Sequence, residues 1–444
     1  MEQKIQLSDH FGYKRLIRFT VPSILMVIVT SVYGVVDGFF ISNFVGKTPF
    51  AAVNFIMPFL MIVGVLGFMF GAGGNALVAK TLGEGKKEKA NEIFSLLTYT
   101  TIISGVVIAV VGFVLIRPIA QVLGAEGEML EYAVIYGRIN LTALPLLMVQ
   151  YAFAGFVVTA EKPKFGLLVT VICGVTNVVG DALFMAVLRW DVVGAALATT
   201  LSQAVGGVVF LAYFARENDS TLKLGKAKWD GKALLKTCTN GSSELLSSIS
   251  GSVVGMLYNT QLLKYAGENG VAAYGAIMYV NFIFAALFIG YSSGVAPVVS
   301  FHYGADNKEE LKGLRRKSRT IILIASVLML GLSECFAVPL AKIFVGYDRE
   351  LFALTVRAFR IYAISFLFGG TAVFGSSFFT ALNDGLTSAM ISFLRTLVFQ
   401  ISAVLLLPLV WGIDGIWYSV VVVEMMAMLV TLLFLTLKQK KYGY

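Results

Sequence analysis

Residues 22–46, PSILMVIVTSVYGVVDGFFISNFVG, decide the fold of this chain. The stretch is long and apolar enough to cross a bilayer, yet Asp37 lies well inside it. An ionised side chain at that depth costs roughly 2.5–3.5 kcal/mol on insertion scales, so membrane proteins keep such a group where it faces protein or water and has a function. Tyr33 lies one turn before Asp37 on the same helix face, and Pro22 interrupts the hydrogen-bond ladder, which makes a bend there cheap.

The composition places the chain among polytopic helical membrane proteins. Of its 444 residues 57% are hydrophobic and 14% are charged, whereas about a quarter are charged in soluble domains. The net charge of +9 comes from short loops between apolar segments, so it sets topology and does not indicate nucleic-acid binding. The scattered cysteines and two histidines lack metal or disulfide spacing, and the N-terminus lacks the pattern of a removable signal peptide. We therefore expect no cofactor.

Twelve apolar segments are each long enough for a membrane span of about 20 residues. They are residues 15–40, 52–79, 92–116, 130–158, 165–188, 192–214, 237–264, 272–300, 319–345, 352–380, 386–410 and 413–437. Lysine and arginine gather in every second connection and in both terminal segments. By the positive-inside rule, both termini are predicted to be cytoplasmic. We expect the protein to lie in the inner (plasma) membrane.

The chain contains an internal repeat at one constant offset, which carries residue 50 onto residue 271. FAAVNFIMPF, which begins at residue 50, aligns with VAAYGAIMYV at 271, and LGEGKKE at 82 aligns with YGADNKE at 303. Each half holds six spans, an even number, so the halves share one orientation and are predicted to be related by a pseudo-two-fold axis along the membrane normal. This predicts an all-α fold of two six-helix lobes, residues 1–220 and 221–444, joined by a basic linker.

The fifth and sixth spans supply further polar groups. In GVTNVVGDALF, Asn177 and Asp181 are four residues apart and share one helix face, and the next span contributes Thr199. Oxygen atoms of this kind suit a monovalent cation or a proton. Structural alternatives remain for each: Asp181 as a hydrated acid near the outer interface, Asn177 in an interhelical hydrogen bond, and Tyr33 as ordinary packing.

These motifs together resemble the multidrug and toxic compound extrusion (MATE) transporters. The resemblance covers nearly the whole chain and adds the glycine-rich GFMFGAGGNALVAKTLGEGKKEKA (residues 67–90), NVVGD (177–181) and GAALAT (194–199) to the first span. It implies two lobes facing a central cleft, with Pro22 as the hinge of the first span. It also implies a cation site in the first lobe, formed by Asp37, Asn177, Asp181 and Thr199 with Tyr33 beside them.

The second lobe departs from the family pattern, because some members also carry acids on the seventh and tenth spans. Here the tenth span has no acid, and Glu244 in the seventh lies near the cytoplasmic end, where the small hydroxyls around it offer hydrogen bonds. Glu334 and Glu424 could pair with arginines between helices. Five residues are predicted to line the cleft, because methionine and aromatic side chains adapt to varied apolar ligands. They are Gln150, Met256, Asn259, Gln261 and Tyr279. The alternative for each is an ordinary lipid-facing or helix-packing position.

We therefore expect a monomeric antiporter surrounded by membrane lipid. It would export amphipathic, often cationic, organic compounds and would be driven by H⁺ or Na⁺ entering the cell. A lipid-linked precursor flippase of the same superfamily is the first alternative; it would need an arginine-rich cleft, and Arg138 and Arg395 are the intramembrane arginines available. A membrane-embedded enzyme and a passive channel are weaker alternatives, because the spans carry no catalytic constellation and a channel has no need of a bendable helix with buried acids.

Overall fold

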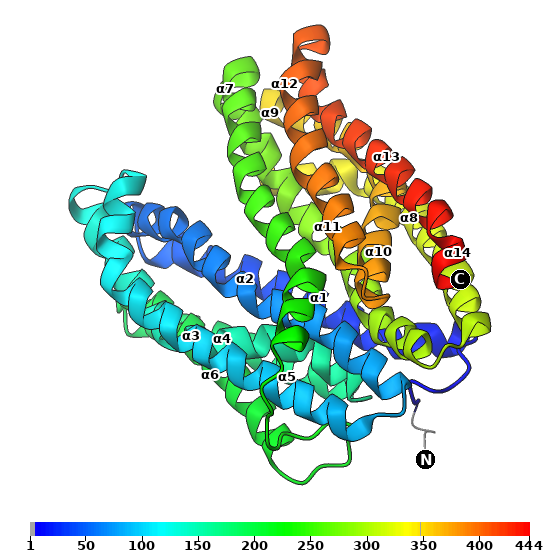
Figure 1. Ribbon diagram of the computed structural model, residues 1–444. Coiled ribbons are helices and arrows are strands. Elements are labelled where there is room, and N and C mark those ends of the chain that lie inside the picture. The colour runs from blue at the N-terminus through cyan, green and yellow to red at the C-terminus, as the bar shows by residue number, and fades with distance from the viewer. Residues whose placement is uncertain (1–4, 347) are drawn as a thin grey trace.

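The structure is a computed structural model that describes residues 5–346 and 348–444, without the side chain of Lys47. Its described regular structure is helical throughout (Figure 1). In chain order the elements are α1 (Tyr13–Phe44), α2 (Lys47–Gly83), α3 (Lys87–Leu123), α4 (Gly127–Thr159), α5 (Pro163–Asp181), the π-helix η1 (Ala182–Val187), α6 (Asp191–Ala215), α7 (Gly231–Gly304), α8 (Lys308–Val345), α9 (Arg349–Ala363), α10 (Phe366–Ala381), α11 (Gly385–Phe393), the π-helix η2 (Leu394–Phe399), α12 (Gln400–Trp411), α13 (Ile413–Leu437) and α14 (Gln439–Tyr442).

These helices confirm the predicted twelve spans. Among the described residues, ten helical segments are long and apolar enough to cross a membrane, and the bent pair α9–α10 makes an eleventh. The 74-residue α7 is two helices joined at Gly267, which adds the twelfth. Gly267 has φ 59° and ψ −151°, a backbone conformation that is essentially restricted to glycine. The loop expected at 265–271 is therefore a kink at one residue.

Three spans are less regular than their sequence suggests. The span predicted as 352–380 breaks between α9 and α10, which meet at 49°. At the break the Ser365 N–H donates to the Tyr362 carbonyl, a tighter bond than the α-helical one. The fifth and eleventh spans each contain a π-helical stretch, and η1 begins directly after Asp181. Such π-helical turns occur often at functional sites.

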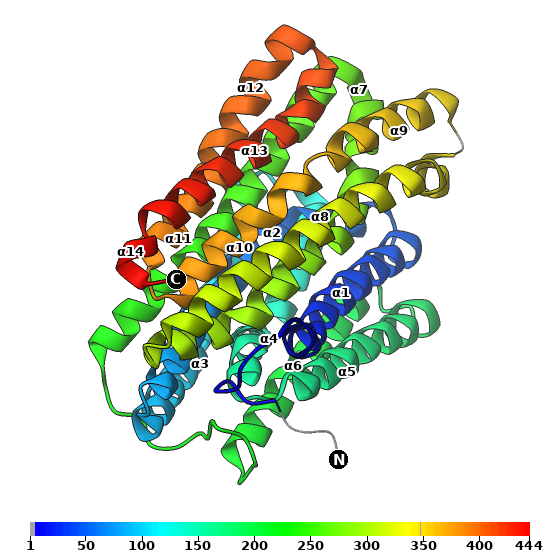
Figure 2. The same cartoon turned by 90° about the vertical axis from the view of Figure 1, so that its right-hand side faces the viewer.

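Two helical bundles make up the fold: α1–α6 form the N-lobe and α7–α13 form the C-lobe (Figure 1). The bundles approach each other at the end of the molecule that carries both chain termini, here called the terminal end, and diverge towards the opposite end (Figures 1 and 2). One hydrophobic cluster contains residues of both lobes, whereas a second, at the far ends of the N-lobe helices, contains N-lobe residues alone. The lobes therefore share a core near the termini and not at the opposite end.

Glycine contacts at the terminal end display the predicted pseudo-two-fold axis. A Cβ added to Gly83 would lie 1.9 Å from the carbonyl oxygen of Phe301, and one added to Gly304 would lie 2.0 Å from that of Lys80. The offset of the repeat carries Gly83 onto Gly304 and Lys80 onto Phe301. The two contacts are therefore related by the repeat. In both of them the backbones approach more closely than any residue with a Cβ atom would permit.

A second pair of contacts repeats this relation nearer the membrane centre. A Cβ at Gly73 on α2 would lie 2.6 Å from the Gly241 nitrogen on α7, and one at Gly294 would lie 3.2 Å from Thr20 Cα on α1. Gly73 corresponds to Gly294, and Thr20 to Gly241, at the same offset along the chain. Small residues thus hold α2 and the second half of α7 close to the axis.

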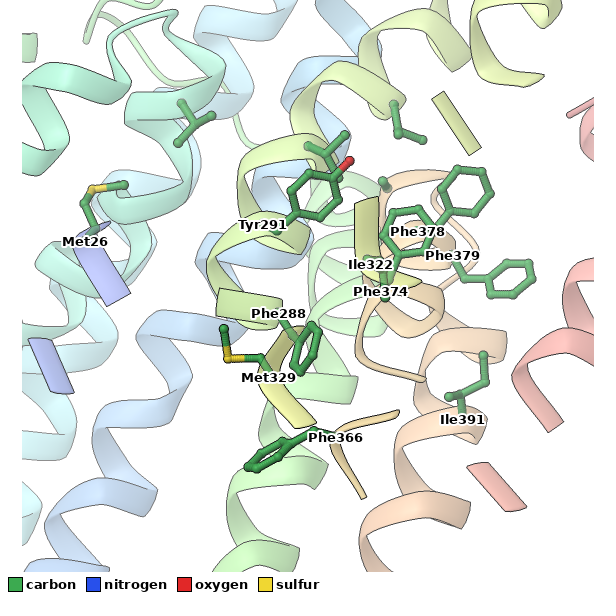
Figure 3. Close-up of a cluster of buried hydrophobic side chains, with 14 of the residues drawn as sticks. Met26, Phe288, Tyr291, Ile322, Met329, Phe366, Phe374, Phe378, Phe379 and Ile391 are labelled. Atoms are coloured by element: carbon green, nitrogen blue, oxygen red, sulfur yellow. The ribbon is translucent and has the colours of Figure 1, made fainter. Parts of the chain in front are cut away.

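The C-lobe core is rich in aromatic side chains (Figure 3). Phe374 lies between Phe378, with ring centroids 5.5 Å apart, and Tyr291, at 6.5 Å. Phe288 fits against Gly370 of α10, where a Cβ would lie 2.6 Å from its ring. The Tyr291 hydroxyl donates to Ser318 Oγ at 2.8 Å, so this buried phenol has a partner within the lobe.

Candidate functional site

The structure brings together the two acids and the amide that the sequence identifies. Asp37 lies on α1 and is 9% exposed; Asn177 and Asp181 lie on α5 and are 2% and 0% exposed. The Asp37 carboxyl group lies within electrostatic range of both of these side chains. Gly174 allows the close approach of α1 to α5, because a Cβ there would lie 3.1 Å from the Tyr33 ring. Tyr33 thereby lies beside the site, and its hydroxyl is close enough to Asp37 to interact electrostatically.

Thr199 joins the same cluster through a residue that the sequence analysis did not identify. Tyr136 on α4 is fully buried, and its hydroxyl lies near that of Thr199 and within electrostatic range of Asp37 and Asp181. A signal was present in the sequence, because Asn140 follows Tyr136 by one helical turn in an apolar span. Asn140 Nδ2 donates to the Tyr136 carbonyl at 3.0 Å, so the two polar groups occupy one face of α4.

The cluster is defined by buried oxygen atoms without hydrogen-bond partners among the described residues. They are Asp37 Oδ1, Tyr136 Oη, Asn177 Oδ1, Asp181 Oδ1 and Oδ2, and Thr199 Oγ1. A buried polar group without a partner costs about 1–3 kcal/mol, and more if it is charged, so this concentration needs a compensating ligand. An all-oxygen set with two carboxylates fits a proton or a hard monovalent cation.

Pro22 lies inside the continuous helix α1 and is buried. Asp37 is about four helical turns further along the same helix. A change in bend at Pro22 would therefore move the Asp37 carboxylate relative to α5 and α6. The structure places the predicted hinge in the helix that carries the first acid.

Gln150, predicted in the cleft, lies in the interior of the N-lobe. Its side chain borders Gly206 of α6, where a Cβ would lie 2.7 Å from Gln150 Cδ and 2.8 Å from the Cys173 sulfur. Gln150 Oε1 is buried without a described partner, as is Gln203 Oε1 on α6. The N-lobe interior therefore holds further polar groups that are able to accept hydrogen bonds.

The remaining cleft candidates are on α7, away from the acid pair. Met256 is 64% exposed, Gln261 is half-buried, and Asn259 lines a groove of about 500 Å³ together with Glu268. The Tyr279 ring stacks on Phe344 of α8 with centroids 5.9 Å apart. Among the described contacts, none joins these four residues to the carboxylates of the N-lobe.

Tyr258, Arg395 and Glu424 of the C-lobe, in contrast, have hydrogen-bond partners within their own lobe. Tyr258, which occupies the position of Asp37 in the second repeat, contacts Ser419 Oγ at 2.6 Å and donates to Gln400 Oε1 at 2.9 Å. Arg395 and Glu424 form a two-pronged ion pair, with Nη2 2.8 Å from Oε1 and Nε 2.9 Å from Oε2.

Two other acids of the second lobe can now be placed. Glu334 pairs with Arg360 at 3.6 Å, which agrees with the expectation that it meets an arginine. Glu244 is exposed, and none of the described hydrogen bonds joins it to the hydroxyls around it.

Comparison with known proteins identifies the family. A family model named MatE matches residues 22–183 and 245–405. The multidrug export protein MepA of Staphylococcus haemolyticus is 23% identical over 433 residues, which cover 95% of this chain and 93% of that protein. A solved structure described as the outward-facing conformation of a multidrug resistance MATE family transporter of the MOP superfamily has a TM-score of 0.93 at 23% identity, with 100% of this chain and 99% of that chain covered. A structure of MATE in the straight conformation has a TM-score of 0.93 at 22% identity over the same shares. The family model covers both repeats and more than half of the chain, so the resemblance is confirmed and this chain belongs to the MatE family.

Proposed function

We propose that the protein is a plasma-membrane antiporter that exports amphipathic, often cationic, organic compounds in exchange for H⁺ or Na⁺. The observation that carries the proposal is the buried set of unpartnered oxygens around Asp37 and Asp181 on helices of one lobe. Similarity to proteins named as multidrug exporters supports the substrate class. The basic terminal and loop residues support cytoplasmic termini, so the diverging end of the lobes would face outward.

The chemistry of exchange follows from the acid pair. Two neighbouring buried carboxylates disfavour double ionisation, and one proton or one sodium ion relieves both the repulsion and the burial cost. Cation binding would draw α1 and α5 together, and the bend at Pro22 would convert that movement into a change of the N-lobe interior. Linkage is reciprocal. If the substrate binds the cation-free arrangement, it weakens cation binding by the same factor by which the cation weakens substrate binding.

Flippase activity is supported less well by the charges in the membrane. A pyrophosphate-bearing lipid would need free arginines, but Arg395 is bound to Glu424 through two hydrogen-bonding nitrogens. Arg138 on α4 lies over the Phe113 ring, 5.0 Å from its centroid, and makes no ion pair among the described residues, so the membrane holds one free arginine where a pyrophosphate would need several. We therefore favour drug antiport and propose that the protein catalyses no covalent chemistry.

Efflux from reconstituted vesicles tests this proposal. The purified protein is placed in liposomes with a fluorescent cationic dye, and a pH gradient and a Na⁺ gradient are imposed separately at zero membrane potential. Dye movement against its own gradient under one of the two ion gradients is expected, and the effective ion identifies the coupling cation. The antiporter proposal would be overturned if dye movement were independent of both gradients. It would also be overturned if the protein moved a labelled pyrophosphate lipid across the bilayer and did not move the dye.

A further inference from the structure

Residues 5–12, which precede α1, form a strap that joins the two lobes across the terminal end. Leu7 and Phe11 are 2% and 0% exposed, so this segment is docked through apolar side chains. The Leu7 N–H donates to Glu161 Oε1 at 2.9 Å, in the α4–α5 turn of the N-lobe. The Phe11 N–H donates to Glu310 Oε1 at 2.9 Å, on α8 of the C-lobe. The segment, here called the N-terminal strap, thus bonds to both lobes over a short length of chain.

Glu310 depends on this strap for its partners. Its second carboxylate oxygen, Oε2, lies 2.6 Å from His10 Nδ1, and the Lys317 ammonium lies 3.9 Å from Oε1. Lys317 also donates to the Phe11 carbonyl. Glu310 is 6% exposed with the strap docked, and release of the strap would exchange its close contacts with His10 and Phe11 for water and a lysine 3.9 Å away. These charge-assisted contacts favour the docked strap.

The segment between the lobes, residues 216–230, makes the corresponding contacts with the N-lobe and is here called the middle strap. Leu222 is fully buried. The Lys223 N–H donates to Asn91 Oδ1 at 2.9 Å, and the Gly225 N–H donates to Ser95 Oγ at 3.0 Å. Both acceptors lie in the first turns of α3. The middle strap therefore docks on the third helix of the N-lobe immediately before it enters α7.

The two straps follow the internal symmetry. Lys87 begins α3 and Lys308 begins α8, and these two residues correspond to each other in the repeat. Each strap precedes the first helix of one lobe and binds the first turns of the third helix of the other lobe. The N-terminal strap precedes α1 and binds α8, and the middle strap precedes α7 and binds α3. The symmetric glycine contacts between α2 and α7 lie at the same end of the molecule.

We propose that the two straps act as a paired clasp that holds the lobes together at the terminal end and must release before that end can open. The clasp goes beyond the proposed function and rests on it only in that an antiporter must expose its site at both ends in turn. In the present arrangement the lobes share a core at the clasped end and separate at the other. Loss of either strap should shift the population towards forms in which the clasped end is open.

Electron–electron distance measurements test the clasp without substrate or ion gradient. In a variant with its three cysteines replaced, spin labels are attached at the exposed positions 87 and 440, one on each lobe. Glu310→Gln removes the charge that the N-terminal strap binds. Glu309→Gln, an exposed neighbour on the same helix, is the matched control. Asn91→Ala combined with Ser95→Ala removes the two acceptors of the middle strap.

At least a tenfold increase in the ratio of wide to narrow separations is expected for Glu310→Gln and for the Asn91→Ala/Ser95→Ala variant, with Glu309→Gln unchanged. Monodisperse elution of each protein establishes that it is folded. If both strap variants keep the wild-type distance distribution, the clasp is refuted; if only one shifts, the paired clasp is refuted in favour of a single latch. Shifted distances in a protein without gradient-driven efflux would refute the proposed function and leave the clasp standing.

Discussion

Replacement of Asp37 by asparagine isolates the charge of the cation site from its shape. The carboxylate is buried on α1, and its partners Asn177 and Asp181 are neutral or of like charge. An interaction with a charged partner contributes about 1.5–3 kcal/mol, and each 1.4 kcal/mol is a factor of ten, so the loss of this charge should weaken cation binding by about 10- to 150-fold. At an unchanged gradient, that loss should abolish gradient-driven efflux.

The same reasoning predicts strong non-additivity. Asp181→Asn should cause the same loss of efflux or nearly so. The double variant should be no worse than Asp37→Asn alone, because the two acids act as a unit and the loss of either one already removes its function. Asp306→Asn, a change of the same chemistry on an exposed loop, should leave transport intact. The assays are dye efflux from vesicles and pH- or Na⁺-dependent substrate binding to the purified proteins. Full gradient-coupled efflux by Asp37→Asn would show that coupling occurs elsewhere, with Glu244 the next residue to test.

Pro22→Ala should slow transport while the protein still folds, since alanine is a good helix former; normal efflux by a well-expressed variant would remove the hinge. Cysteines introduced at residues 86–89 and at the exposed Arg316 should react with an impermeant reagent only after cells are permeabilised, and labelling of intact cells would reverse the proposed topology. Burial raises the pKa of Asp384, but hydrogen bonds from Lys438 and Tyr442 outweigh it and hold that pKa below its usual value. Its stabilising effect, about 1–3 kcal/mol, should therefore be present above pH ~4 and be lost at lower pH, and thermal unfolding of Asp384→Asn should show a weaker acid dependence than the wild type.

The architecture was predictable because membrane crossing is recorded in local composition. The length of each apolar segment, the placement of basic residues and the internal repeat together predict twelve helices and the symmetry of Gly83 with Gly304. The breaks were less predictable. An apolar run has the same composition whether it is straight or bent, so the angle at Ser365 left no signal. The polar residues on both sides of Gly267 suggested a loop where the chain kinks at one residue. The lobe boundary at residue 220 stays a prediction.

The candidate site was predictable where its residues violate the membrane pattern. Acids and amides in apolar spans are rare, so Asp37, Asn177 and Asp181 stand out. Tyr136 stands out less, because tyrosine is common in ordinary packing. Asn140 one turn later is its only sequence signal, and the three-dimensional arrangement is needed to place its hydroxyl near Thr199. The straps were hidden for a different reason. The bond from the Phe11 N–H to the Glu310 carboxylate joins opposite halves of the chain, a separation over which no sequence pattern operates.

The difference between the two lobes explains why coupling should reside in one of them. At the repeat position of Asp37 the C-lobe carries Tyr258, whose hydroxyl is bonded to Ser419 and Gln400. The intramembrane charges of Arg395 and Glu424 likewise satisfy each other. A cation entering the C-lobe would have to break these bonds, whereas in the N-lobe it would supply partners that the buried oxygens lack among the described residues. The N-lobe thus leaves the oxygens around Asp37 and Asp181 unpartnered among the described residues and available for an ion, whereas the C-lobe bonds Tyr258, its counterpart of Asp37, to neighbouring helices.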